Sequence, residues 1–374
     1  MAHLDCNQVT AILTRAIVDG RRCLAARADL VALLHAGGVE PSQVIHVHVA
    51  HGDGYACTGM PVGAAAIADY TIDTARTRGP VVAARALIEY VKSKQVPMTM
   101  SLVLRDATVD CPIHIDGISL VTAEEHELSN LDLSSGVRDR TAANVTAYSS
   151  LRMTAPMLTT PNEIGSRQAR DNLELLETIR ASLALVSSGR TTSVGCSTSA
   201  SIGECSLSTS FATDCADTPG LRLSDTAGLE WSELVSAYLR CDEPCRRRLA
   251  VAIHRIETGS DFRLRPVDAA IDIGIALESM FSNDGETAEI SYRLALRSAL
   301  LLGTTISDRM LIRACVKKFY RERSRAVHTG YIDLSSKQDV ITARTLAVRA
   351  VREIIRRGSI PDWAQVEIEC GIEK

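Results

Sequence analysis

The chain has 374 residues, of which 46% are hydrophobic and 23% are charged, a balance typical of soluble globular proteins. This length is sufficient for two domains with cores of their own, and the net charge of −4 argues against a protein wrapped wholly in nucleic acid. No apolar run reaches the roughly 18 residues of a membrane span, and the N-terminus lacks a signal-peptide pattern. Together with eleven scattered cysteines, which favour reduced thiols, these features lead us to expect a cytoplasmic protein.

The first half of the chain alternates between helical and extended patterns. Helix-like spacing of apolar residues occurs at 8–36, 81–94 and 163–186. Alternation typical of strands occurs at 43–50, 98–104 and 113–121. We therefore expect an α/β or α+β N-terminal domain over residues 1–186, with its topology left open.

The composition changes after residue 186. From Ser187 to Pro219, Ser, Thr, Gly and Cys dominate, and apolar periodicity is almost absent. Such a stretch buries too little surface to offset its ordering entropy, so it is expected to be a mobile loop or linker. We predict a linker over residues 187–229.

Residues 230–374 are expected to form an all-α bundle. Apolar residues repeat at helical spacing in the segments 231–239, 246–257, 267–281, 288–302, 308–327 and 337–357. Gly303, Gly330 and Gly358 each follow a predicted helix, where a left-handed cap favours glycine. The short connections predict antiparallel neighbours in a compact bundle.

The only strongly basic region lies inside this predicted bundle. Residues 308–358 contain 13 Lys and Arg against 5 Asp and Glu, a local charge of +8. A basic face confined to one domain is expected where a phosphate backbone docks. A pair of solvated amphipathic helices would have the same composition.

A possible reactive pair lies at the end of the segment 308–327. Arg323 and His328 enclose four residues, and Ser324 is four residues before His328, on the same helix face. Arg323 and His328 are separated by about 140° around a straight helix, so fraying near Gly330 or a second copy of the helix would have to bring them together. Alternatively, Arg323 caps carbonyls and His328 interacts with the helix dipole.

Three blocks of the C-terminal half resemble the HEPN superfamily, and within it the Apea-like branch. They are Asp272-Ile-Gly-Ile-Ala-Leu-Glu278, Glu289-Ile-Ser-Tyr-Arg-Leu-Ala-Leu-Arg297 and Phe319-Tyr-Arg-Glu-Arg-Ser-Arg-Ala-Val-His-Thr-Gly330. Their order and spacing fit one bundle, and the resemblance covers about residues 230–358. The chain departs from the family pattern at Thr329, which stands before the glycine that usually follows the histidine directly.

The resemblance implies an HEPN-type helical bundle that forms a face-to-face dimer and cleaves single-stranded RNA without a metal or other cofactor. In this chemistry the 2′-hydroxyl of the RNA attacks the adjacent phosphate and leaves a 2′,3′-cyclic phosphate. His328 would then be the general base or acid, Arg323 would stabilise the phosphate, and Ser324 would orient the histidine or the substrate. By the same analogy, the protein would be a toxin or antiviral defence effector whose N-terminal domain binds a trigger ligand or protein.

Three further residues have two interpretations each. Glu278 lies one turn after Gly274, whose small size permits close helix approach, so Glu278 would either hold Arg323 extended or form a plain interhelical ion pair. Arg321 and Arg325 are either RNA contacts or solvated surface residues. For the whole domain, the alternative to a nuclease is a non-catalytic HEPN scaffold for dimerisation or RNA binding.

Two other groups of residues contain side chains of the types that bind metal ions. His46, His48, His51 and Asp53 fall in and after one strand, but zinc needs three or four convergent ligands, and we prefer a strand with polar edge residues. Cys241 and Cys245 have no second cysteine pair, so two ordinary cysteines are expected. We therefore expect no metal site.

Overall fold

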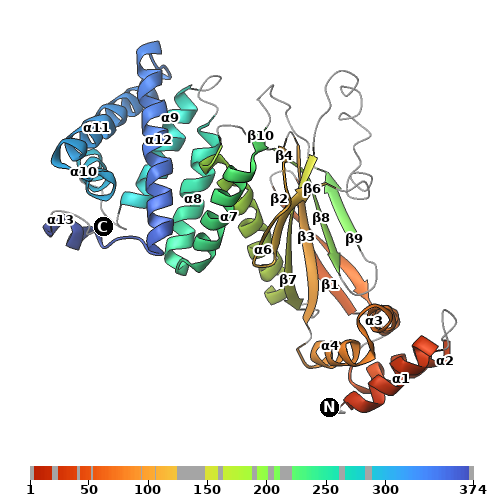
Figure 1. Ribbon diagram of the computed structural model, residues 1–374. Coiled ribbons are helices and arrows are strands. Elements are labelled where there is room, and N and C mark those ends of the chain that lie inside the picture. Colours follow the sequence, from red (N-terminus) through yellow and green to blue (C-terminus); the bar gives the residue numbers. More distant parts are fainter. Residues whose placement is uncertain are drawn as a thin grey trace. The chain divides into compact units, whose positions relative to one another are not determined.

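The fold is described from a computed structural model of the chain (Figure 1). The described residues are 4–18, 24–39, 43–51, 54–93, 95–105, 107–123, 148–158, 163–187, 192–200, 206–210, 221–260, 266–282 and 289–369. They form two compact units, each discontinuous in sequence. The first comprises Met1–Arg105, Gly117–Leu176 and Thr192–Cys215; the second comprises Asp106–Asp116, Glu177–Thr191 and Ala216–Lys374. These boundaries differ from the predicted division into residues 1–186, a linker over 187–229 and residues 230–374.

Four helices of the first unit share one apolar core. They are α1 (Cys6–Val18), α2 (Leu24–Ala36), α3 (Ala64–Arg78) and α4 (Pro80–Ser93). Buried Val9, Leu30, Ile67 and Leu87 supply one side chain to this core from each helix. Helix α3 was not predicted because its buried face is mostly alanine and threonine, which contrast weakly with the polar face.

The strands of the first unit form antiparallel ladders. In the larger sheet the order is β6-β7-β3-β8-β9, and β1 pairs with β2 in a separate hairpin. Their bounds are β1 (Gln43–His51), β2 (Gly54–Val62), β3 (Gln95–Arg105), β6 (Ile118–Thr122), β7 (Tyr148–Leu158), β8 (Thr192–Ala200) and β9 (Ser206–Ser210). This confirms a mixed helix-and-strand N-terminal part, with an antiparallel sheet.

The predicted linker over 187–229 is wrong in its described parts. Residues 192–200 form β8, which pairs with β3, and residues 206–210 form β9, which pairs with β8. Backbone hydrogen bonds to a neighbouring strand do not require apolar side chains, and threonine and valine favour extended backbone. The low hydrophobicity of these two segments therefore does not prevent them from forming strands.

The second unit is predominantly helical. Its strands are β4 (Ala107–Val109), which pairs in parallel with β10 (Leu221–Leu223), and β5 (Ile113–Ile115). The helix α6 (Glu163–Ala181) ends in this unit and continues as the 3-10 helix η3 (Ser182–Leu185). The remaining helices are α7 (Asp225–Arg240), α8 (Glu243–Thr258), α9 (Pro266–Phe281), α10 (Ile290–Leu302), α11 (Ile306–Thr329), α12 (Leu334–Arg357) and α13 (Trp363–Ile368).

Side chains at the helix ends explain most of these boundaries. Asp242 accepts a hydrogen bond from the backbone N–H of Cys245, so α8 begins there with Pro244 in its first turn. Gly330 and Gly358 end α11 and α12 with left-handed φ angles of 67° and 80°, as predicted. Gly303 is instead extended, and a glycine is needed there for space, because an added Cβ would lie 2.5 Å from Cγ of Arg309.

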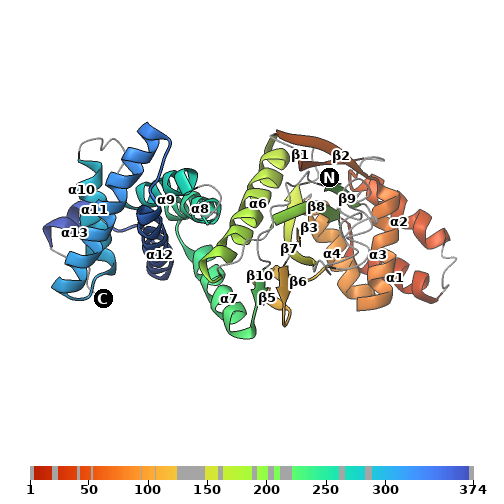
Figure 2. The same ribbon diagram turned by 90° about the horizontal axis from the view of Figure 1, so that it is seen from above.

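Helices α9, α10, α11 and α12 pack together, as both ribbon views show (Figures 1 and 2). Ile273, Leu301, Phe319 and Val351 bring one fully buried side chain to the core from each helix. Burial of each such side chain stabilises the fold by roughly 1.5–3 kcal/mol. Among the described residues, no helix has the length and apolar character needed to cross a membrane.

Candidate functional site

Helix α11 carries most of the predicted site, and its two faces differ. Ile312, Val316, Phe319 and Ala326 recur at helical spacing and are buried against the neighbouring helices. The opposite side is exposed along its whole length. A residue on α11 therefore either packs inside the unit or faces outward, depending on its position around the helix.

Arg323 lies on the packed side of α11, and its side chain packs against helix α9 at Gly274. A Cβ atom added to Gly274 would lie 2.3 Å from Nε of Arg323 and 2.7 Å from its Cδ, so only glycine leaves room for this side chain. The side chain of Arg323 is 21% exposed, and its Nε is buried with no hydrogen-bond partner among the described atoms. The sequence pattern correctly indicated a close helix approach at Gly274.

Glu278 and Tyr320 hold the guanidinium group of Arg323. Oε1 of Glu278 lies 3.4 Å from Nη1 of Arg323, and the Tyr320 hydroxyl donates a hydrogen bond to the same carboxylate oxygen. The centre of the guanidinium group lies 5.1 Å from the centroid of the Tyr320 ring, within cation–π range. The predicted ion pair is thus present, and Tyr320 is an additional member that the prediction missed. Its spacing of three residues from Arg323 placed it on the same side of the helix.

The environment raises the pKa of Glu278 above its ordinary value. Partial burial between α9 and α11 disfavours the charged carboxylate and raises the pKa, while Arg323 lowers it. Burial outweighs the ion pair because the 3.4 Å separation is long for a charge-assisted contact. A carboxyl group with a raised pKa beside a partly buried arginine is a feature that concentrates at functional sites.

His328 and Ser324 lie on the other side of α11 and are exposed. Within the described parts of the chain, neither side chain makes a hydrogen bond or ion pair. Helix α11 is continuous through Thr329, so fraying does not bring Arg323 and His328 onto one face. The two remain about 140° apart around the axis, and one copy of the chain does not bring them into contact.

The two candidate RNA-binding arginines differ in their surroundings. Arg325 pairs with Glu322 and, at 2.9 Å, with Asp333, so two carboxylates compete for its charge. Arg321 is largely exposed, and its ion pair with Glu322 is long, at 3.7 Å. Of these two arginines, Arg321 is therefore the more accessible cation.

Thr329 is the last residue of α11, directly before the glycine that caps the helix. The Thr329 hydroxyl donates to the carbonyl of Arg325, and Gly330 N–H bonds to the carbonyl of Ala326. The helix therefore includes Thr329, and His328 lies in its last turn, where a cation is favoured by the helix dipole.

The described residues contain no group of three or more His, Cys, Asp or Glu side chains arranged to hold a metal ion. The backbone of β1 includes His46, His48 and His51, but their side chains and Asp53 lie outside the described residues. Cys241 and Cys245 are both buried and free. Burial raises the pKa of Cys245 to about 12 and also raises that of Cys241, so neither thiol ionises readily at neutral pH.

Comparisons of the chain with protein-family models, with curated proteins and with solved structures found no match in any of the three. The three sequence blocks and the geometry around Arg323 are therefore the features of the chain that indicate a function.

Proposed function

We propose that the second unit is an HEPN-type bundle and that the protein is a metal-independent endoribonuclease acting on single-stranded RNA. The observation that carries the proposal is the position of Arg323, whose side chain packs on Gly274 and is flanked by Glu278 and Tyr320. All four residues belong to the blocks that resemble the family. The first unit would regulate the nuclease in response to a trigger, in a toxin or antiviral defence role that rests on the resemblance alone.

The chemistry needs a group that moves a proton and a group that stabilises charge. His328 is suited to the first task, because an imidazole ring can both accept and donate a proton, and its exposed position is open to a substrate. It would remove the proton from the 2′-hydroxyl as the oxygen attacks phosphorus. The bond to the 5′-oxygen then breaks, and that oxygen takes a proton from an acid. Arg323 would stabilise the additional negative charge on the phosphoryl oxygens.

Because one chain separates Arg323 from His328 around α11, we place the active site between two copies of this helix. A two-fold axis beside α11 would set the His328 side chains of both protomers in one cleft, one as base and the other as acid. The side chain of Arg323 is 21% exposed, so part of it is accessible from outside the unit. Ser324, one turn before His328, would contact the histidine or the substrate.

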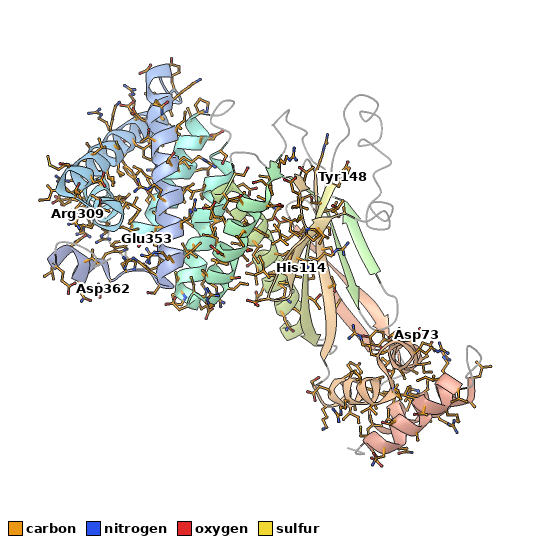
Figure 3. All side chains as sticks on the ribbon, in the orientation of Figure 1. Asp73, His114, Tyr148, Arg309, Glu353 and Asp362 are labelled. Carbon is orange, nitrogen blue, oxygen red and sulfur yellow. The ribbon has the colours of Figure 1, made fainter. Side chains whose placement is uncertain are left out.

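The test is cleavage of a single-stranded RNA by the full chain in EDTA, with a mass measurement of the products. Wild type should leave 2′,3′-cyclic phosphate and 5′-hydroxyl ends, and a 2′-deoxy substrate should stay intact. His328→Ala should lose activity, whereas His114→Ala, another exposed histidine of the same unit (Figure 3), should retain it. Equal cleavage by wild type and His328→Ala would overturn the catalytic role, and a requirement for added metal would overturn the mechanism.

A second candidate function is a non-catalytic scaffold for dimerisation or RNA binding. The contacts of Arg323 favour this function, because its guanidinium group already interacts with Glu278 and Tyr320 within one chain. In that case Arg323 would stabilise the α9–α11 contact, and His328→Ala would change neither RNA binding nor RNA integrity.

A further inference from the structure

Tyr292 on α10 forms a cluster with two cations of α11. The guanidinium group of Arg313 lies 5.2 Å from the centroid of the Tyr292 ring, and the ammonium group of Lys317 lies 5.4 Å from it. Tyr292 is nevertheless 41% exposed. The cluster therefore presents an aromatic surface and two positive charges together.

No carboxylate among the described residues forms an ion pair with Arg313 or Lys317. The neighbouring Lys318 differs, because its ammonium group lies 2.9 Å from Asp339. In addition, Nε of Arg313 is buried and has no hydrogen-bond partner in the described part of the chain. The charges of the Tyr292 cluster (Tyr292, Arg313 and Lys317) are thus not neutralised within the unit, and an external anion would complement them.

The Tyr292 cluster is continuous with the exposed side of the candidate site. Lys317, Arg321, Ser324 and His328 follow one another at spacings of four, three and four residues, so they form one stripe along α11. The stripe extends over about 16 Å from Lys317 to His328 at 1.5 Å per residue. It contains two cations and no carboxylate.

We infer that the Tyr292 cluster is a nucleotide-binding subsite that holds single-stranded RNA at a distance from the cleaved bond; this inference rests on the proposed function. A base would stack on the exposed part of the Tyr292 ring, while Arg313 and Lys317 bind the adjacent phosphates. From there the backbone would follow Arg321 to His328. An aromatic ring beside cations suits a single strand, because stacking requires unpaired bases and tolerates any sequence.

The experiment measures binding of a fluorescein-labelled single-stranded RNA by anisotropy in EDTA. Every protein carries His328→Ala, so the RNA stays intact. Tyr292→Ala should weaken binding about fivefold or more, and Tyr292→Phe, which keeps the ring, should restore most of the affinity. Lys317→Ala should weaken binding and reduce the dependence of log Kd on log salt concentration by about 0.7. Lys318→Ala removes the same charge from a paired lysine and should bind like the parent.

Three outcomes overturn the subsite. The first is unchanged binding in both Tyr292→Ala and Lys317→Ala; the second is an equal loss in Lys317→Ala and Lys318→Ala, which would indicate only general charge. The third is a change in self-association without a change in RNA binding, which would make the surface a protein contact. Cleavage is measured separately with the wild-type protein, which keeps His328. If it cleaves RNA while the variants bind normally, only the subsite fails; if it neither binds nor cleaves RNA, the proposed function fails.

Discussion

Arg323 on α11 lies directly against the backbone of Gly274 on α9, closer than any side chain at position 274 would allow. An added Cβ would come within 2.3 Å of Nε and 3.2 Å of Cζ. Real Cβ atoms do not come as close as 2.3 Å to another side chain, so one substitution tests whether Arg323 packs on Gly274. Both tryptophans, Trp231 and Trp363, belong to the same unit, and their fluorescence therefore follows its unfolding.

Gly274→Ala should destabilise the second unit when Arg323 is present and stabilise it when Arg323 is absent. Alanine inside a helix is favoured over glycine by about 0.5–1 kcal/mol, but the clash with Arg323 costs roughly 1–3 kcal/mol. Urea unfolding of Gly274→Ala, Arg323→Ala and the double variant gives the coupling between the two positions. If Gly274→Ala stabilised the wild-type protein, Arg323 would not pack against Gly274.

Arg323→Lys should retain the fold and lose most of the cleavage activity. Lysine keeps the positive charge beside Glu278 but lacks the planar fork that can contact a carboxylate and a phosphate together. We expect a fall of about 100-fold in the single-turnover cleavage rate, comparable to loss of one charge-stabilising donor. Arg247→Lys on α8, an exposed arginine paired with Glu243, is the matched control and should cleave normally. Normal cleavage by Arg323→Lys would exclude a role for guanidinium geometry.

His328→Ala should change activity without changing stability. Its side chain is exposed and makes no hydrogen bond or ion pair with the described residues, so the free energy of unfolding should change by less than about 0.5 kcal/mol. Loss of a general acid or base should slow cleavage by about 100-fold or more. A variant that unfolds more easily and loses activity in proportion would point to a structural role instead.

The sequence allowed helices α7 to α12 to be predicted because each has an apolar stripe and marked ends. The close approach at Gly274 was also predictable, since glycine and glutamate one turn apart in α9 face one neighbour. The separation of Arg323 and His328 around α11 followed from helix geometry. Tyr320 was missed because its hydroxyl reaches Glu278 across 42 residues of sequence, and only packing brings α9 and α11 together. The strands β8 and β9 were missed because polar residues leave no hydrophobic pattern.

Helix α13 was also missed, and its attachment gives a further prediction. Six residues are too few for a periodic pattern, but Trp363 is buried and its indole N–H donates to the carbonyl of Met280. Arg297, also buried, donates from Nε to Oε1 of Glu367 at 2.6 Å. These two hydrogen bonds attach α13 to α9 and α10.

Trp363→Ala should destabilise the second unit by about 3–5 kcal/mol, because it leaves a large cavity against Phe281. Glu367→Gln should cost less, about 1–3 kcal/mol, since Arg297 loses a charged acceptor but Glu367 is partly solvated. Urea unfolding followed by circular dichroism measures both, because Trp363→Ala removes one fluorophore. Glu369→Gln, two residues further along, provides the control and should be nearly neutral. A neutral Trp363→Ala would mean that α13 is not packed on the bundle.

The raised pKa of Glu278 predicts the direction in which pH changes the stability of the site. A carboxyl group with a higher pKa in the folded protein binds its proton more tightly there, so its stabilising contribution is complete below the ordinary value of 4.5. That contribution is lost as the pH rises through the folded pKa. Glu278→Gln cannot ionise, so its stability relative to wild type should increase as the pH rises from 4 to 7. Urea unfolding at several pH values measures this difference, with Glu243→Gln on the surface of α8 as the control for removal of one charge. A relative stability that falls over the same range would show that the ion pair with Arg323 outweighs the burial of Glu278.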